Sequence, residues 1–260
     1  MSLLAARDIG ISFGGVVAVD GVSFAAEAGQ VLSIIGPNGA GKTTLFNVVS
    51  GLYRASRGRV TLSGEDVTGR SPEALARKGL SRTFQNLQIF SRMTALDNVM
   101  VGRHLRERRS LLADLLRLPS VARQNRETQE AAEKLLAFVG LAERGGTPAG
   151  ALPYGALKRL EIARALALEP KVLLLDEPAA GCNPVETEGI ERLIREVADR
   201  GVAVVLVEHD MRLVMAISDR VLVLTGGQPL AEGTPQEVRA DPAVVAAYLG
   251  PQGGREAARA

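Results

Sequence analysis

A glycine-rich run early in the chain has the composition and spacing of a phosphate-binding loop. The run reads Gly36, Pro37, Asn38, Gly39, Ala40, Gly41, Lys42, Thr43 and Thr44. It fits the template of a glycine, four free positions and Gly-Lys-Ser/Thr, between an apolar stretch (31–35) and helix-compatible sequence (43–50). Glycines let the backbone turn its N–H groups toward a phosphate, and a helix N-terminus adds partial positive charge there. The pattern therefore predicts that Lys42 reaches the β- and γ-phosphates and that the Thr43 hydroxyl ligates Mg²⁺. The alternative, a glycine-rich turn with a chance lysine, would not require a strand before the run and a helix after it.

Two carboxylates stand at the end of a second apolar run, residues 172–175. Asp176 is placed to hold Mg²⁺ through water, and Glu177 is placed to polarise the attacking water. Alone, such a pair would more often be two solvated acids at a strand end. Combined with the glycine loop, it predicts a catalytic site that binds ATP and Mg²⁺ and hydrolyses the γ-phosphate.

Two other polar residues are candidates for the same chemistry. His209 follows the apolar run 202–207, and from the end of a strand in the same sheet it could reach the γ-phosphate. Gln85 stands where strand-like sequence gives way to helical sequence, and its carbonyl oxygen could ligate Mg²⁺ and swing out when phosphate leaves. Spacing alone supports Gln85 weakly, because most such glutamines lie on the surface. His104 lies in a basic segment, residues 103–126, which predicts a solvated helical face, with anionic lipid head groups as the alternative ligand.

The pattern of apolar residues predicts how these groups are positioned. Uninterrupted apolar runs at 172–175, 202–207 and 221–224 are typical of a parallel sheet covered on both faces. Residues 3–31 instead alternate β-prone stretches with Gly and Asp turns, as in an antiparallel sheet. From about residue 86 to 164 the sequence is helical in character. We therefore predict an α/β fold: a P-loop NTPase core with a parallel sheet, an N-terminal antiparallel β subdomain and an α-helical subdomain.

The composition is consistent with a single domain over residues 1–250, followed by a Gly-, Arg- and Ala-rich tail (251–260) that we expect to be disordered. Of the 260 residues, 46% are hydrophobic and only 3% aromatic, so the core must be mostly aliphatic. A net charge of +2 argues against nucleic acid as the main partner. A single cysteine, Cys182, rules out an intrachain disulfide and favours a reducing compartment. We find neither a signal peptide nor an apolar run of about 20 residues, so another chain would have to hold this one at a membrane.

The ordered set of motifs resembles the ATP-binding subunit of ATP-binding-cassette (ABC) transporters. The set comprises the glycine loop, Gln85, the segment 152–155, the Asp176-Glu177 pair and His209. The resemblance extends over roughly residues 3–250. Shorter stretches resemble the branched-chain amino acid uptake subfamily more narrowly, namely residues 82–86, 154–155, 159–164, 179–181, 208–211 and 231–235.

This resemblance implies a head-to-tail pair of such subunits with two ATP molecules between them. Each ATP would lie on one glycine loop and face the signature segment of the other subunit, so that Tyr154 and Gly155 act in trans. Phe13 would stack on adenine, although a core aromatic remains the alternative. Gln85 and the helical segment after it would pass the motion to two integral-membrane permease subunits, which receive solute from an extracytoplasmic binding protein. The chain would then lie peripherally on the cytoplasmic face of the inner membrane.

The signature segment departs from the common Leu-Ser-Gly-Gly-Gln. Pro153 replaces the serine and cannot donate even a backbone N–H, and Ala156 lacks an amide side chain. Losing one hydrogen bond to a charged group costs about 1.5–3 kcal/mol. We therefore expect an asymmetric pair, in which the partner ATPase is a different chain with a fuller signature. Asn183 also stands where an aspartate is common, which puts the usual contact between subunits in doubt.

The function expected from these features is ATP hydrolysis that powers an importer of branched-chain or related amino acids. An export ATPase of the lipopolysaccharide type shares most motifs, but residues 82–86 and Tyr154 argue against it. A soluble ABC-type ATPase of DNA repair or translation usually has two cassettes, a coiled coil or a basic face. This sequence has one cassette, no heptad run and a nearly balanced charge. A nucleotide kinase would lack the Tyr154-Gly155 signature and the distant His209. The sequence does not identify the solute, nor whether the pair in the cell is made of like or unlike chains.

Overall fold

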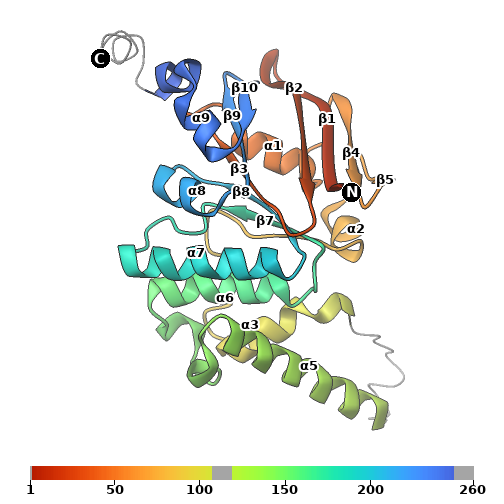
Figure 1. Cartoon of the computed structure of the whole chain (residues 1–260). Coiled ribbons are helices and arrows are strands. Elements are labelled where there is room, and N and C mark those ends of the chain that lie inside the picture. The colour runs from red at the N-terminus through yellow and green to blue at the C-terminus, as the bar shows by residue number, and fades with distance from the viewer. Residues whose placement is uncertain (1, 107–118, 249–260) are drawn as a thin grey trace. The chain divides into compact units, whose positions relative to one another are not determined.

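The computed structural model describes residues 2–106 and 119–248 (Figure 1). It divides into two compact units. The first is drawn from Met1–Leu80, Lys171–Glu177 and Glu191–Ala260, and the second from Ser81–Pro170 and Pro178–Ile190. The predicted tail, residues 251–260, and part of the basic segment, with Arg108, Arg109 and Arg117, lie outside the described residues.

An antiparallel sheet opens the first unit, as the alternating sequence predicts (Figure 1). Its strands are β1 (Ser2–Phe13), β2 (Val16–Glu27), β4 (Arg57–Leu62) and β5 (Glu65–Asp66), in the order β2-β1-β4-β5. A two-residue turn joins β1 to β2, and its residues Gly14 and Gly15 have φ values of 54° and 87°. Positive φ at both central positions matches the right-handed twist of a hairpin, and glycine adopts it without strain.

A second sheet carries the predicted parallel strands. They are β3 (Val31–Ile35), β6 (Leu80–Arg82), β7 (Val172–Asp176), β8 (Ala203–Val207), β9 (Arg220–Thr225) and β10 (Gln228–Gly233), in the order β10-β9-β3-β8-β7-β6. The pairs β3–β8, β3–β9 and β7–β8 are parallel, and every residue of β3, β7 and β8 is buried. Burial on both faces explains the unbroken apolar runs. The antiparallel edge strand β10 was not predicted, because its residues are half exposed and include Pro229.

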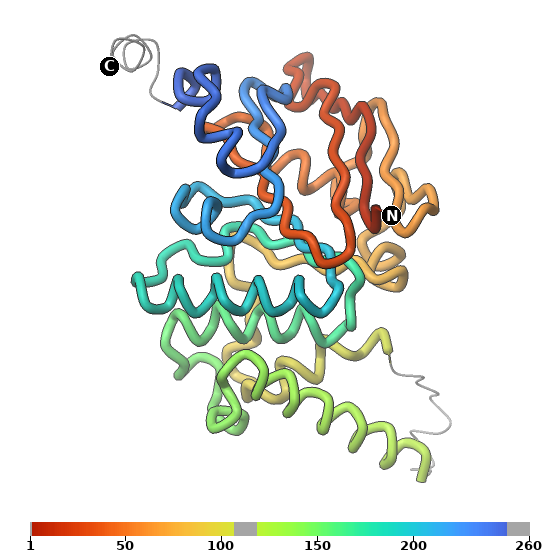
Figure 2. Tube along the Cα trace, in the orientation of Figure 1, coloured from red at the N-terminus to blue at the C-terminus, as the bar shows by residue number. Residues whose placement is uncertain are grey.

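The helices of the first unit are α1 (Lys42–Val49), α2 (Pro72–Arg77), α8 (Met211–Ile217) and α9 (Pro235–Ala240). Side chains of α1, with Phe46 among them, share one hydrophobic cluster with residues of both sheets, such as Leu4 and Ile34. The two sheets and α1 therefore enclose a common aliphatic core. Residues 242–248 form a further helix after α9, which can be followed at the blue end of the trace in Figure 2.

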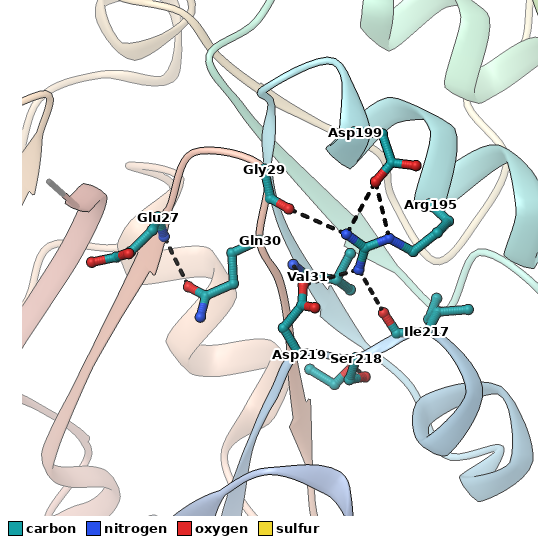
Figure 3. A network of polar contacts seen from close by, with 10 residues as sticks. Glu27, Gly29, Gln30, Val31, Arg195, Asp199, Ile217, Ser218 and Asp219 are labelled. Atoms are coloured by element: carbon teal, nitrogen blue, oxygen red, sulfur yellow. Dashed lines mark hydrogen bonds and ion pairs between the residues drawn. The ribbon is translucent and has the colours of Figure 1, made fainter.

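A polar network around Arg195 joins the start of β3 to the end of α8 and to Asp219, the residue before β9 (Figure 3). The guanidinium donates to Asp219 Oδ2 at 2.9 Å and to the carbonyls of Gly29 and Ile217 at 3.3 and 3.2 Å. Asp219 Oδ2 also accepts the N–H of Val31 at 2.8 Å. The fixed fork of an arginine suits such divergent acceptors.

The second unit is mostly helical, with α3 (Ala95–Gly102), α5 (Pro119–Phe138) and α6 (Tyr154–Leu166). Short 3₁₀ turns lie at His104–Arg106, Ala142–Arg144 and Ala149–Ala151. The helix α7 (Pro184–Asp199) begins in this unit and ends in the first. The unit thus contains the predicted helical region of residues 86–164 and also residues 178–190. None of the described helices combines the length and apolar character of a membrane span.

Candidate active site

The glycine loop runs from the end of β3 to the first turn of α1. Gly36, Gly39 and Gly41 have φ values of 151°, 80° and 93°, which only glycine adopts readily. A Cβ on Gly36 would overlap the carbonyl oxygen of Leu224, and one on Gly41 would lie 2.6 Å from that of Ala18. The fold of the loop therefore requires glycine at positions 36 and 41. The same glycines leave the loop backbone open. Its tip residues, Asn38 and Gly39, are exposed.

Lys42 folds back over this loop. Its Nζ donates to the carbonyl oxygens of Gly36 at 2.7 Å and Pro37 at 3.1 Å. Burial lowers the pKa of Lys42, while the charges of Glu177 and Asp176 act in the opposite direction. The predicted lysine and the predicted acidic pair therefore lie within electrostatic reach of one another.

The acidic pair ends β7, the neighbour of β8. Asp176 is 3% exposed and is paired in register with Val207. Glu177 follows in a left-handed backbone conformation with φ 48°, and its N–H donates to the carbonyl of Val207 at 2.9 Å. Positive φ is uncommon outside glycine, and here it marks the point where the chain leaves the strand. The side chain keeps 22% exposure, so water can reach the carboxylate.

His209 lies just past the end of β8, beside Glu177. Its Nδ1 is 3.8 Å from Glu177 Oε1 and 3.8 Å from Glu208 Oε2. The sequence predicts no role for Glu208, yet this side chain is 1% exposed and its Oε2 accepts the N–H groups of His209 at 2.9 Å and Asp210 at 3.3 Å. The buried carboxylate fixes the turn that presents the histidine. A charged residue directly after an apolar strand was the available signal.

A tyrosine near the end of the described chain also reaches the glycine loop, and the sequence did not predict this contact. Tyr248 accepts a hydrogen bond from the backbone N–H of Gly36, and burial raises the pKa of this phenol. Val244, one turn earlier on the same helix, shares a hydrophobic cluster with Ile35, the residue before Gly36. The helix of residues 242–248 thus lies against the base of the glycine loop. No short motif marks such a distant contact.

Phe13 ends β1 and is 45% exposed, so it is not part of the core. Its ring meets that of Tyr53 edge to face, with centroids 5.3 Å apart. An exposed ring suits the predicted stacking on a base.

The signature segment belongs to the second unit and begins α6. Pro153 is the N-cap of this helix and makes no side-chain cap, and Ala156 is buried. Tyr154 is 44% exposed, and its ring lies 3.0 Å from where a Cβ on Gly181 would stand. A Cβ on Gly155 would overlap the Glu186 carboxylate, so another residue there would require this side chain to move. The backbone N–H groups at the start of this helix remain the candidate phosphate ligands.

Gln85 also belongs to the second unit. It is exposed and lies in an irregular segment directly after β6. The structure therefore gathers Lys42, Asp176, Glu177 and His209 in the first unit, whereas Gln85, Tyr154 and Gly155 occupy the second.

The oxygen donors suit Mg²⁺. Thr43 is the second residue of α1, and the buried Asp176 carboxylate ends the strand next but one to β3. Mg²⁺ takes few protein ligands and keeps several waters. The described residues hold no group of three or more His, Cys, Asp or Glu side chains that could bind a metal unaided. A hydroxyl and a carboxylate, supplemented by phosphate oxygens, fit the ion without such a group.

Comparison with known proteins places this geometry in a family. The sequence matches the ABC transporter family over residues 19–180 and a branched-chain amino acid ATP-binding cassette transporter family over residues 228–250. It is 46% identical over 249 residues to the high-affinity branched-chain amino acid transport ATP-binding protein BraF of Pseudomonas aeruginosa, covering 95% of this chain and 98% of BraF. The lipopolysaccharide export system ATP-binding protein LptB of Acidithiobacillus ferridurans is 38% identical over 250 residues, covering 96% of this chain and 98% of LptB.

A solved structure gives the same result. The ADP conformation of an ATP-binding cassette of an ABC transporter superposes with a TM-score of 0.84 and 35% identity, over 96% of this chain and 99% of that one. A chain that shares this fold and carries the complete glycine loop has the fold and the phosphate-binding loop of a nucleotide-binding ATPase. The chain belongs to the ATP-binding subunits of ABC transporters, in the family of branched-chain amino acid transport ATP-binding proteins.

Proposed function

We propose that this chain hydrolyses ATP to power the uptake of branched-chain or related amino acids. The observation that carries the proposal is the approach of Lys42 to the Asp176-Glu177 pair beside the glycine loop. The match of residues 228–250 and the greater identity to BraF favour uptake over lipopolysaccharide export.

The phosphate end of the nucleotide would lie on the glycine loop, residues 36–44, and accept hydrogen bonds from its backbone N–H groups that have no other acceptor. Lys42 would leave the carbonyls of Gly36 and Pro37 for the β- and γ-phosphates, and Thr43, Asp176 and Gln85 would hold Mg²⁺. When bound there, the ion would supply positive charge against the charge that develops on the phosphate oxygens.

Glu177 would orient the attacking water and accept its proton, since its side chain remains accessible. His209, held beside Glu177 by the buried Glu208, would contact the γ-phosphate. Phe13 would stack on adenine from its exposed position at the end of β1.

The second ATPase subunit would be a different chain. Pro153 and Ala156 leave α6 with backbone donors only, so Tyr154 and Gly155 would serve a weaker ATP site on the partner. The site on this chain's own Lys42 and Glu177 would face a fuller signature and would carry most turnover. A pair of different ATPase subunits would hydrolyse ATP at one complete site and would not require a second complete site.

The membrane partners would dock on the second unit. A hollow of about 690 Å³ there is lined by residues on both sides of Gln85 and by residues of α6, with Phe84, Phe90 and Arg164 among them. The Arg164 guanidinium lies 5.7 Å from the Phe90 ring centroid, and Phe90 is 49% exposed. An exposed aromatic surface of this kind suits a cytoplasmic segment of a permease. The chain would thereby be held at the cytoplasmic face of the membrane.

The test is affinity purification of this subunit from detergent-solubilised native membranes, with partners identified by mass spectrometry. We expect two permeases and a second, different ATPase. Phe90→Ala should reduce recovery of the permeases, whereas Leu52→Ala, which removes a 47% exposed side chain from the first unit, should not. Recovery of ribosomes or repair proteins would contradict transport, and uptake of labelled leucine by vesicles of these membranes would test the solute.

A further inference from the structure

A single buried carboxylate holds both sides of the segment that carries Gln85. Glu161, in the middle of α6, is 4% exposed. The backbone N–H of Gln88 donates to its Oε1 at 3.4 Å, and the backbone N–H of Phe84 donates to the same carboxylate. Gln85 lies between these two amides, and all four residues belong to the second unit.

The burial of Glu161 makes these contacts necessary. Burial raises its pKa, and the two backbone donors and the charges of Lys158 and Arg164 oppose that rise. An ionised carboxylate that loses its partners in such a place is strongly destabilised. The segment 84–88 and the middle of α6 are therefore expected to move together, because separating them would leave Glu161 without its loop donors.

The helix leads from this contact to the signature segment. Glu161 stands about two turns from Tyr154, the first residue of α6, along an unbroken helix. A hydrogen-bonded helix of this length transmits a displacement as a rigid element. A shift of the loop at Phe84 and Gln88 would thus shift the N-terminus at Tyr154 and Gly155.

We propose that Glu161 is a positioning residue that ties the Gln85 segment to helix α6, so that engagement of Gln85 at one ATP site changes the placement of the signature offered to the other. The inference rests on the proposed function, in which Gln85 ligates Mg²⁺ and Tyr154 and Gly155 act in trans. It adds a residue that neither proposal requires and that touches neither nucleotide.

The chain offers a matched control at the other end of the same segment. Asn98 of α3 is fully buried, accepts the N–H of Phe90 at 3.0 Å and donates to the Phe90 carbonyl at 3.0 Å. It anchors the segment to α3 instead of α6. Asn98→Ala should cost stability without cutting the connection through Glu161.

Hydrogen exchange read by mass spectrometry tests the connection. The subunit carries Glu177→Gln so that ATP persists, and exchange is followed at residues 36–44, 83–89 and 154–158 with and without Mg-ATP. In this background ATP should slow exchange in all three segments. With Glu161→Gln added, residues 83–89 should exchange about tenfold faster before ATP is added, because a charged acceptor is replaced by a neutral amide that holds the loop N–H groups more weakly. ATP should then still slow residues 36–44 and 83–89 but no longer slow residues 154–158.

Each outcome has a separate meaning. Glu161→Asp keeps the charge on a shorter side chain and should give an intermediate response, which covers the case that Glu161→Gln does not fold. Asn98→Ala should keep the response at residues 154–158. An unchanged response there in Glu161→Gln would overturn the inference, as would its absence without the substitution. No effect of ATP on residues 36–44 would instead contradict the proposed function.

Discussion

At the scale of single residues, Glu177 is the group on which turnover depends most directly. It is the carboxylate that combines water access with proximity to Lys42 and His209. Glu177→Gln removes the base and keeps the shape, so ATP hydrolysis by the purified complex should fall by about 100-fold or more while ATP still binds. A phosphate-release assay measures the rate. Glu73→Gln, on an exposed pair with Arg77, serves as the control and should leave the rate unchanged.

Tyr248 gives a second prediction at this scale. Its hydroxyl accepts a hydrogen bond from the N–H of Gly36. It lies one helical turn after Val244, which shares a hydrophobic cluster with Ile35. Tyr248→Phe keeps the ring and removes the acceptor, so the free energy of unfolding should fall by about 1 kcal/mol. Urea denaturation of the isolated subunit measures this change. An unchanged midpoint would mean that water replaces the hydroxyl at no cost.

At the scale of elements, the start of α6 determines how the signature works. Pro153 already has N-cap geometry, with φ −58° and ψ 155°, but provides no cap. Pro153→Ser should therefore add about 1 kcal/mol of stability through the missing cap. Turnover of the assembled complex should stay equal or rise, because the serine hydroxyl adds a phosphate ligand in trans. A sharp fall in turnover would contradict the proposed asymmetry of the pair.

The elements also show what the sequence could predict. The parallel strands were predictable because burial on both faces leaves unbroken apolar runs, as in Val172–Asp176. The glycine loop was predictable because its backbone geometry excludes side chains at Gly36 and Gly41. The strand Gln228–Gly233 was not, since an exposed edge needs no periodic pattern.

The two site residues that the sequence did not predict differ in kind. Glu208 binds the amides of the next two residues, so its contacts are local, and only the burial of its carboxylate could not be predicted from the sequence. Tyr248 reaches Gly36 because Val244 packs against the end of β3, and this contact has no fixed spacing along the chain. The buried Glu161 likewise bonds to amides far away in sequence, and nothing in its neighbours predicts which ones.

At the scale of the whole molecule, the Arg195 network joins α7, the start of β3, the end of α8 and Asp219, the residue before β9 (Figure 3). Arg195→Lys keeps the charge but cannot bond Gly29, Ile217 and Asp219 together. The free energy of unfolding should fall by about 1–2 kcal/mol. Arg77→Lys, in an exposed pair on α2, is the matched control and should change it by less than about 0.5 kcal/mol. Equal effects of the two substitutions would show that the network adds nothing beyond a surface charge.

The stability of the molecule should also depend on pH through Glu161. Its pKa in the folded chain lies above the ordinary value of 4.5, chiefly because of burial. As pH falls from 7, the folded chain therefore takes up this proton before the unfolded chain does, and the contribution of Glu161 to stability rises until the pH is below 4.5. As pH rises through the folded pKa, that contribution is lost again.

Comparison with variants isolates this effect from the titration of other carboxyls. The free energy of unfolding of the unsubstituted chain minus that of Glu161→Gln should increase on acidification from pH 7 toward 4.5. The same difference taken against Asn98→Ala, which removes a buried anchor that does not titrate, should stay flat. Urea denaturation across this range measures both. A flat or falling difference for Glu161→Gln would mean that the loop amides and the Lys158 and Arg164 charges outweigh burial, and that Glu161 remains ionised because its hold on Phe84 and Gln88 is stronger than its desolvation.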